Sequence, residues 1–541
     1  MKNIFHPKLF SLKKNYSKKQ FVSDIIAGII VAIIALPLSI ALAIASGVSP
    51  EKGLYTAIVA GFVIAVLGGS NVNISGPTAA FATIVAGIVA QHGIDGLAVA
   101  TVMAGIILII MGICRFGSLI KYIPYTITTG FTSGIALTIV IGQIKDFLGL
   151  TFAEGTHAVE TMEKVSAVGN SISTLNPWAL LVGLISLAIL IVWPKISKKI
   201  PGSLIAVIAG VVIVKLFKIP VNTIGDLYTI SRNLPAFSVP DVSFESIRLL
   251  APSAFTIAIL AGIESLLSCV VSDGMINDRH NSNTELIAQG VGNIFSALFG
   301  GIPATGAIAR TAANVKNGGR TPVSGIVHAI ILLLVLVVLM PYAAWIPMPV
   351  IAAILFMVAY NMSEWRHFAE ICKTSPKSDI TVLVLTFVLT VVFDLVVAIE
   401  VGMIVTVLLF MKRMSDVTHI RKWSEKTGGR FKQKPEKTEV IEINGPMFFA
   451  TSDKFSDISL QSDTEVLILR MHNVPAIDAS AMRSLNSVSD MCKNNNISLI
   501  ISHANKQPLS VMKKSGFYDA VGDDRFVANI DEALMLAENL I

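Results

Sequence analysis

The chain has 541 residues, of which 53% are hydrophobic and only 14% are charged, and its mean hydropathy is +0.71. Soluble domains carry roughly 25% charged residues, so this composition excludes a soluble protein over most of the length and indicates several membrane spans. The sequence pI of about 9.0 does not require a nucleic-acid partner, because basic loops beside anionic lipid account for it.

Polar and basic residues fill positions 1–20, ahead of the first apolar run. A cleaved signal peptide has a short apolar run followed by a small-residue cleavage site, and this pattern does not occur here. We therefore expect residues 1–20 to form a cytoplasmic N-terminal segment that stays on the protein.

Charge-poor stretches run from Ile25 to Phe410, and a helix needs about 20 such residues to cross a bilayer. They divide into fourteen segments, which begin near Ile25, Leu54, Pro77, Gly96, Ile123, Pro177, Gly202, Pro252, Leu286, Thr305, Pro322, Ile346, Ile380 and Leu395. The third and the tenth are too short to cross alone. We expect residues 21–413 to form a polytopic α-helical membrane domain.

Basic residues flank several of these segments, for example Lys19 before the first, Lys195 after the sixth and Lys412 after the last. An even number of segments places both termini on one side of the membrane, and the positive-inside rule identifies that side as the cytoplasm. We therefore expect a multi-pass protein of the inner (plasma) membrane with cytoplasmic N- and C-termini.

Two short motifs interrupt the third and tenth segments with small residues and proline, namely Ser75-Gly76-Pro77-Thr78-Ala79-Ala80 and Pro303-Ala304-Thr305-Gly306-Ala307. At both places we expect a helix to begin part-way through the bilayer. A helix N-terminus presents unpaired N–H groups and roughly +0.5 of partial charge, so it tolerates this depth only where something polar, usually an anion, meets it. The pair of motifs therefore predicts a binding site for a small inorganic or carboxylic anion.

The spacing of these motifs indicates an internal repeat. Gly76 and Pro303 lie 227 residues apart; 29 residues separate Gly47 from Gly76, and 29 separate Gly274 from Pro303. The repeat continues in a pair of motifs 223 residues apart, Tyr122-Ile123-Pro124 and Trp345-Ile346-Pro347. Corresponding interruptions in two halves of a membrane protein point to a secondary transporter with its site at the repeat interface.

The chemistry of the first motif follows from Pro77, which suits the first turn of a helix because its missing N–H would have no partner there. The amides left to face an anion are those of Thr78, Ala79 and Ala80. The mirrored amides in the second motif belong to Gly306, Ala307 and Ile308. Small residues in membranes also serve close helix packing, but the matched positions of the two motifs favour a site.

Arg310 is expected one turn into the second half-helix. An arginine binds an oxyanion with two parallel hydrogen bonds, which suits carbonate-, sulfate- or carboxylate-like groups. Ser39, in the first segment, faces either this site or lipid. Phe81 either lines the site with its positive ring edge or packs in the interior, which is the commoner use of a lone Phe.

Glu264 lies inside the eighth segment with no basic residue near it in the sequence, and Ser268 follows on the same helix face. An intramembrane carboxyl group is costly and by default functional. It either binds the coupling ion, a proton or, together with Ser268, Na⁺, or it is a permanently protonated structural group. We expect no metal site and no cofactor, since the four cysteines lack metal-ligand spacing. We expect no enzymatic activity, because the polar C-terminal part is small and poor in catalytic clusters, and the absence of a P-loop disfavours a primary pump.

Past Phe410 the chain becomes polar. Residues 414–437 are predicted to be a linker, and residues 438–541 a small α/β domain. Its expected strands are Val440–Ile443, Glu465–Met471 and Ile497–Ser502, and its expected helices are Ala479–Cys492, Gln507–Lys514 and Ile530–Leu540.

These motifs, in this order, resemble the SulP anion transporters. The resemblance is carried by Asp24-Ile25-Ile26-Ala27-Gly28, Ser75 to Ala80, Gly262-Ile263-Glu264-Ser265-Leu266-Leu267, Arg310-Thr311 and Gly318-Gly319-Arg320-Thr321-Pro322. Residues 474–480, Val-Pro-Ala-Ile-Asp-Ala-Ser, are similar to the STAS domain of the same family. There Ser480 matches a position at which related antagonists of anti-sigma factors are phosphorylated, although a helix N-cap is the simpler role for it.

The resemblance implies a 7+7 inverted repeat with core and gate domains, a homodimer, and an anion held between the two half-helices beside Arg310. Sodium-coupled bicarbonate carriers of the family tend to have Asp and Thr where this chain has Glu264 and Ser268, which favours a proton here. Sulfate-type members often have Gln at the position of Leu38, which makes sulfate less certain. We expect a proton-coupled symporter of sulfate, bicarbonate or dicarboxylates; the alternatives are a sodium-coupled bicarbonate symporter, an exchanger or an anion channel. A membrane-tethered signalling protein with a cytoplasmic partner for its STAS domain is a third class.

Overall fold

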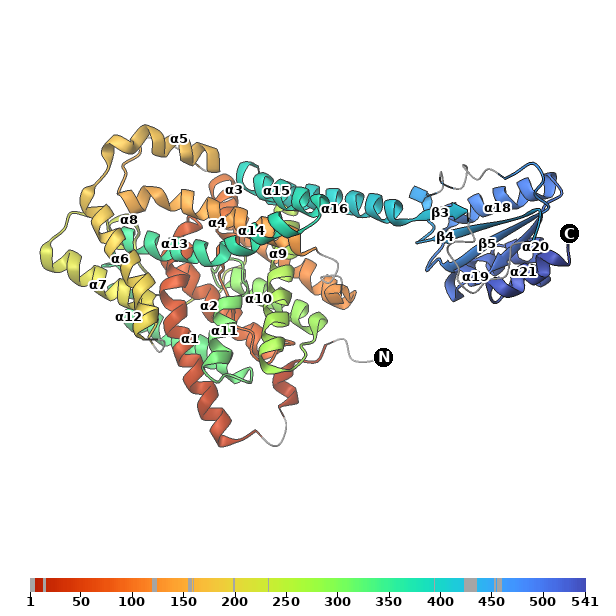
Figure 1. The fold of residues 1–541 in the computed structure, drawn as a ribbon. Helices are drawn as coiled ribbons and strands as arrows, with labels where there is room; N and C mark the ends of the chain where they lie inside the picture. The colour runs from red at the N-terminus through yellow and green to blue at the C-terminus, as the bar shows by residue number, and fades with distance from the viewer. Residues whose placement is uncertain are drawn as a thin grey trace. The chain divides into compact units, whose positions relative to one another are not determined.

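Helices dominate the first of the two units into which the chain folds, Met1–Met403 and Ile404–Ile541 (Figure 1). The computed structural model describes residues 5–541 except 13–15, 119–123, 154–157, 159, 198–199, 232, 394, 423–434, 452–453 and 455–459. Eight of the described helices are long and apolar enough to cross a membrane.

The first half of the membrane domain holds the predicted segments one to seven. Its elements are η1 (Lys8–Ser11), α1 (Lys18–Ala45), α2 (Pro50–Leu67), β1 (Ser75–Gly76), η2 (Ala79–Phe81), α3 (Ala82–Ile113), α4 (Tyr125–Leu148), α5 (Thr161–Ser171), η4 (Ile172–Thr174), α6 (Pro177–Ile196), α7 (Gly202–Phe217) and α8 (Ile224–Leu227). Gly93 breaks α3 with φ +68°, a left-handed conformation that favours glycine, and this kink separates the third segment from the fourth.

The second half repeats this order with segments eight to fourteen. Its elements are α9 (Phe244–Ile276), α10 (Ser282–Leu298), β2 (Thr305–Gly306), α11 (Ile308–Lys316), α12 (Val323–Ala343), α13 (Met348–Ser363), α14 (Trp365–Thr374), α15 (Lys377–Val392) and α16 (Leu395–Val417). Pro124 and Pro347 each occupy the N-cap of a helix, α4 and α13, so the repeat holds at this point too. Tyr122 and Ile123 lie outside the described residues.

The two halves meet at their interrupted segments. β1 pairs with β2 in antiparallel register, Ser75 opposite Gly306 and Gly76 opposite Thr305. Antiparallel pairing of equivalent segments fits an inverted repeat. Helices α3 and α10 pack closely at Gly105 and Gly290. A Cβ atom on Gly290 would lie only 2.5 Å from the carbonyl oxygen of Gly105. Small residues here allow the two backbones to touch.

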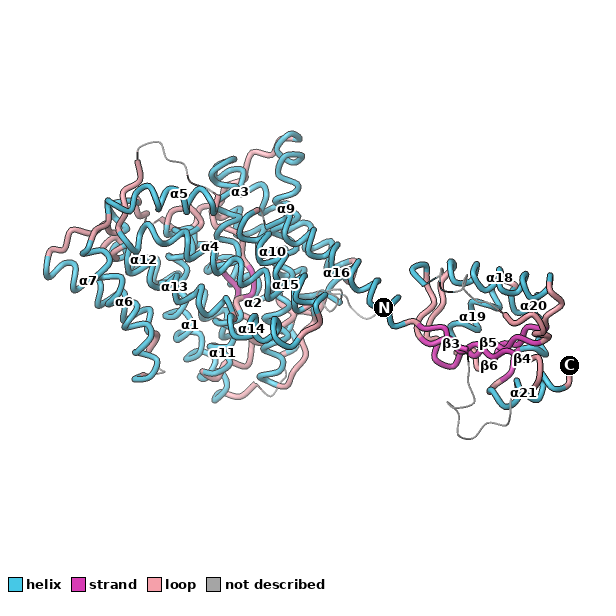
Figure 2. Tube along the Cα trace, turned by 45° about the horizontal axis from the view of Figure 1, so that its top comes forward, coloured by secondary structure: helices cyan, strands magenta, loops and turns pink. Residues whose placement is uncertain are grey.

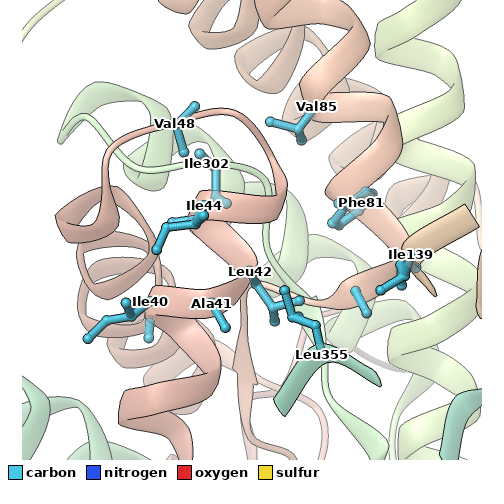
Figure 3. Close-up of a cluster of buried hydrophobic side chains, with 14 of the residues drawn as sticks. Ile40, Ala41, Leu42, Ile44, Val48, Phe81, Val85, Ile139, Ile302 and Leu355 are labelled. Atoms are coloured by element: carbon cyan, nitrogen blue, oxygen red, sulfur yellow. The ribbon is translucent and has the colours of Figure 1, made fainter. Parts of the chain in front are cut away.

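Apolar side chains from several helices fill the interior of the membrane domain. One continuous cluster includes Leu42 of α1, Phe81 of η2, Ile139 of α4 and Leu355 of α13, which Figure 3 draws together. Phe81 is only 1% exposed. Its surroundings are those of a packed core residue, which is the second of the two roles that the sequence leaves open for it.

The second unit is built on a five-stranded sheet in the order β3-β4-β5-β6-β7, in which only the β3–β4 pair is antiparallel. The strands are β3 (His419–Lys422), β4 (Thr438–Asn444), β5 (Val466–Asn473), β6 (Ser498–Ser502) and β7 (Phe526–Val527), and the helices are η6 (Phe449–Thr451), α18 (Ala479–Asn494), α19 (Lys506–Lys514), α20 (Phe517–Val521), η7 (Asp523–Arg525) and α21 (Ile530–Glu538). Helices α18 to α20 cover one face of the sheet and α21 the other (Figure 2).

Side-chain alternation along β5 divides the core of this unit in two. Leu467 and Leu469 pack under α18 to α20, and Val466 and Ile468 pack under α21. Every strand and helix expected between residues 440 and 540 is present.

Two details of this unit differ from the sequence-based expectation. β3 lies inside the stretch 414–437 that the sequence assigns to a linker, of which residues 423–434 lie outside the described residues. The N-cap of α18 is Asp478, whose side chain accepts a hydrogen bond from the amide of Ala481. Ser480 therefore lies within the first turn of α18 and does not cap it.

Candidate functional site

The first half-helix begins two residues later than Pro77 suggests. Thr78 is the N-cap, in an extended conformation with φ −126°, and the amide of Phe81 donates to the Thr78 carbonyl oxygen at 3.3 Å. Pro77 therefore precedes the helix, because the chain is still leaving β1 there. The amides of Ala79 and Ala80 are the ones without a partner inside the helix.

The second half-helix, α11, has Ala307 as its N-cap. Two of the three amides predicted to face the anion are already engaged: Gly306 N–H donates to Ser265 Oγ at 2.9 Å, and Ala307 N–H donates to the Ile74 carbonyl oxygen at 2.8 Å. This corrects the prediction for Gly306 and Ala307, whose backbones join α11 to α9 and to the chain before β1. Ile308 is the first amide without a helical partner, and its side chain is 43% exposed.

Arg310 joins the two half-helices. Its side chain is buried, and its Nη2 donates to the Pro77 carbonyl oxygen at 3.1 Å and contacts Ser39 Oγ at 3.5 Å. Its Nη1 has no hydrogen-bond partner among the described residues. The guanidinium lies so close to Gly76 that a Cβ atom there would be 2.5 Å from Nη1. Ser39 is fully buried, so it does not face lipid.

Glu264 reaches the same stretch of chain from α9. Its Oε2 accepts a hydrogen bond from Thr78 Oγ1 at 3.0 Å. Arg310 and Glu264 thus contact neighbouring residues, Pro77 and Thr78, but form no ion pair with each other among the described side chains. A cationic group of α11 and a carboxyl group of α9, both in the second half of the domain, therefore converge on the start of the first half-helix.

Ser268 does not join Glu264, although both lie on α9. Its Oγ is 2.8 Å from Asn73 Oδ1 and 3.1 Å from Thr311 Oγ1, and it is 1% exposed. The predicted pairing of Glu264 with Ser268 as ligands of one cation is therefore not what the structure has. A helical i, i+4 spacing places two side chains on one face, and here each finds a different neighbour.

Sequence reasoning missed the buried carboxylate of Glu285. It is fully buried in α10 and accepts four hydrogen bonds from the chain just before β1 and from α10 itself: Gly69 N–H (2.8 Å), Ser70 N–H (3.2 Å), Asn73 Nδ2 (2.7 Å) and Gln289 Nε2 (3.0 Å). The expected ninth segment begins near Leu286, which leaves Glu285 looking like a flanking charge. Because α10 begins at Ser282, Glu285 lies inside this helix. With that boundary, the argument from intramembrane carboxyl groups that selects Glu264 selects Glu285 as well.

Both the membrane part and the C-terminal part of the chain match known protein families. The model of the sulfate permease family matches residues 21–386, and that of the STAS domain matches residues 432–533. A putative sulfate transporter of Bacillus subtilis, YvdB, is 40% identical over 96% of this chain and 98% of its own length. The bicarbonate transporter BicA of Picosynechococcus sp. is 30% identical over 94% of each chain.

Two solved structures resemble the fold. Murine Solute Carrier 26 family member A9, an anion transporter in the inward-facing state, superimposes with a TM-score of 0.90 over 98% of this chain and 94% of that one, at 19% identity. The transmembrane domain of a cyanobacterial BicA superimposes with a TM-score of 0.64 over 72% of this chain and 98% of that one, at 31% identity. The chain is a multi-pass anion transporter that belongs to the sulfate permease family and carries a C-terminal STAS domain.

Proposed function

We propose that this anion transporter is a secondary carrier, which takes up a small oxyanion together with a proton by alternating access. The observation that carries the proposal is the convergence of Arg310 and Glu264 on Pro77 and Thr78. A channel needs a positive group to attract anions but has little use for a carboxyl group at the same place. A carrier that couples its anion to a cation needs both.

Arg310 is the proposed anion ligand, together with the amides that have no helical partner at the starts of the two half-helices. Its Nη2 donates to the Pro77 carbonyl oxygen, while the two N–H groups of Nη1 have no partner in the described part of the chain. The amides of Ala79, Ala80 and Ile308 add the partial positive charge of two helix ends. Thr78 carries the hydroxyl that links this anion site to Glu264.

Sulfate or bicarbonate is the proposed substrate, with C4-dicarboxylates as the third class. The relatives named for sulfate and bicarbonate transport support the first two. All three classes carry oxygen atoms that accept hydrogen bonds from an arginine and from helix N-termini.

Glu264 is the proposed proton carrier. An anion that arrives at the half-helix starts offsets the positive field of Arg310 and of the helix ends, and that field is what favours an ionised carboxylate nearby. Anion binding and proton binding on Glu264 therefore reinforce each other, as symport requires. The Ser268 hydroxyl is hydrogen-bonded to Asn73 and Thr311, so a Na⁺ ion beside Glu264 would have fewer ligands.

The second candidate is sodium-coupled bicarbonate transport, which the 30% identity to BicA favours. An exchanger or an uncoupled anion channel would use the same half-helix site without a coupling ion.

We also propose that both termini lie in the cytoplasm, that the protein resides in the inner membrane as a homodimer, and that the STAS domain binds a cytoplasmic partner.

Uptake of radiolabelled anions into proteoliposomes tests this function. Sulfate, bicarbonate, succinate and chloride are compared under an inward proton gradient and, separately, under an inward sodium gradient. The proposal expects sulfate or bicarbonate to accumulate against its gradient only when the proton gradient is present. Accumulation that follows sodium alone would favour the second candidate, and downhill flux that ignores both gradients would favour a channel.

A further inference from the structure

His328 is a fully buried histidine in α12 whose two ring nitrogens, Nδ1 and Nε2, both lack a hydrogen-bond partner among the described residues. A neutral imidazole carries one donor and one acceptor. Buried polar atoms in folded proteins are almost always paired, so an imidazole with neither nitrogen used needs a reason.

His328 lies one helical turn after Gly325, on the same face of α12. A Cβ atom at Gly325 would be 2.9 Å from the Ala65 side chain, 3.6 Å from the Ile74 side chain and 3.8 Å from the Asn73 carbonyl oxygen. Two residues after Ile74, a Cβ atom at Gly76 would be 2.5 Å from Arg310 Nη1, so this face of α12 and the guanidinium both pack against residues 74–76.

Arg310 also has a buried polar group without a hydrogen-bond partner among the described residues. Its Nη2 is engaged with Pro77 and Ser39, but its buried Nη1 has no partner in the described part of the chain. The imidazole and Nη1 thus both lack partners among the described residues, and both belong to elements that pack against residues 74–76. One water molecule satisfies both at once, because it accepts from Nη1 and donates to an unprotonated ring nitrogen.

We propose that His328 is a positioning residue of the anion site, which holds the Arg310 guanidinium through one bridging water. One Nη1 N–H then points to the water and the other is left directed at the anion. This inference rests on the proposed role of Arg310 as the anion ligand. It gives α12 a part in setting anion affinity. The residues placed in the site so far belong to other elements.

A structural role for His328 predicts the opposite consequences. If its nitrogens were merely tolerated in the core, replacing it with an apolar side chain would remove two unmet polar atoms and leave transport unchanged. If it holds Arg310, the same replacement loosens the guanidinium and weakens anion binding while the fold remains intact.

The test compares His328→Leu and His328→Met, which remove the ring nitrogens, with His328→Gln, which keeps a donor and an acceptor. Leu332→Met, one turn further along α12 and also buried, is the control. KM and Vmax are measured for sulfate and for bicarbonate uptake into proteoliposomes, and thermal unfolding is measured on the purified proteins. We expect KM to rise about tenfold in the Leu and Met variants, with Tm unchanged or higher, and to return to within about threefold of wild type in the Gln variant.

A wild-type KM in either apolar variant, or an equal rise in KM in the Gln variant, would overturn the inference. Arg310→Ala is measured in the same series to separate the two proposals. If Arg310→Ala loses anion affinity while the His328 variants keep it, only the role of His328 is wrong. If Arg310→Ala keeps the wild-type KM, or wild type transports neither anion, the proposed site itself is wrong and the role of His328 is rejected with it.

Discussion

Arg310 is the residue on which the proposed anion site depends most. Its replacement by Ala removes the side-chain positive charge that the described residues place at the half-helix starts, together with its hydrogen bond to the Pro77 carbonyl oxygen. We expect Arg310→Ala to insert and elute as a monodisperse protein while its KM for anion uptake rises about 30-fold or more. Arg310→Lys keeps a point charge but loses the planar fork, so its KM should fall between the two. Unchanged KM in the Ala variant would remove Arg310 from the site.

Gly76 matters because the guanidinium of Arg310 rests against it. A Cβ atom there would lie 2.5 Å from Nη1 and 3.5 Å from Ala57, so Gly76→Ala must displace the Arg310 side chain. We expect the KM for anion uptake to rise by about tenfold. Gly87→Ala in α3 is the matched control, because a Cβ atom at Gly87 meets nothing within 4 Å. Equal uptake kinetics in the two variants would show that the contact with Gly76 does not position Arg310.

At the residue scale, the sequence predicts which side chains matter better than it predicts their partners. Arg310 and Glu264 stand out because charged groups are rare in membrane segments, and both reach the first half-helix. The amides of Gly306 and Ala307 look free in the sequence, but they bind Ser265 and Ile74. These partners lie on other elements. The local sequence around Gly306 and Ala307 cannot predict these contacts, because only the tertiary fold brings the groups together.

Among the elements, α10 holds the chain before β1 through a single carboxylate. Removal of the Glu285 side chain leaves the buried donors of Gly69, Ser70 and Asn73 without an acceptor. We expect Glu285→Ala to lower the free energy of unfolding by about 3 kcal/mol or more, seen as a large fall in Tm. Glu245→Ala, on the exposed first turn of α9, should change it by no more than about 0.5 kcal/mol. Similar Tm values for the two variants would mean that the four hydrogen bonds do not stabilise this loop.

The elements also show where sequence patterns are strong and weak. Long apolar runs mark the spanning helices, and Gly and Pro mark the breaks at Gly93 and before each half-helix. β3 escapes prediction because His419 to Lys422 form a short, largely exposed edge strand with no apolar alternation. The β1–β2 pairing escapes it too, since each strand has only two residues, too few for any periodicity.

In the whole molecule, every residue of the proposed anion site belongs to the first unit, Met1–Met403. A chain that ends after Val417, at the end of α16, keeps every proposed ligand; one that ends after Lys437 would keep β3 without its partner β4. We expect the shorter chain to bind sulfate or bicarbonate with an affinity within about threefold of full length, measured by calorimetry, while its transport rate falls. A monodisperse truncated protein with no anion affinity would show that the STAS domain contributes to the site.

Proton coupling is tested by uptake measured against external pH in the absence of sodium. Wild type and Glu264→Gln are compared in proteoliposomes with the anion that wild type accumulates best, its concentration held constant. Wild-type uptake should rise as external pH falls, and Glu264→Gln should lose this dependence while it still binds or exchanges the anion. Wild-type uptake that ignores pH but requires sodium would contradict the account.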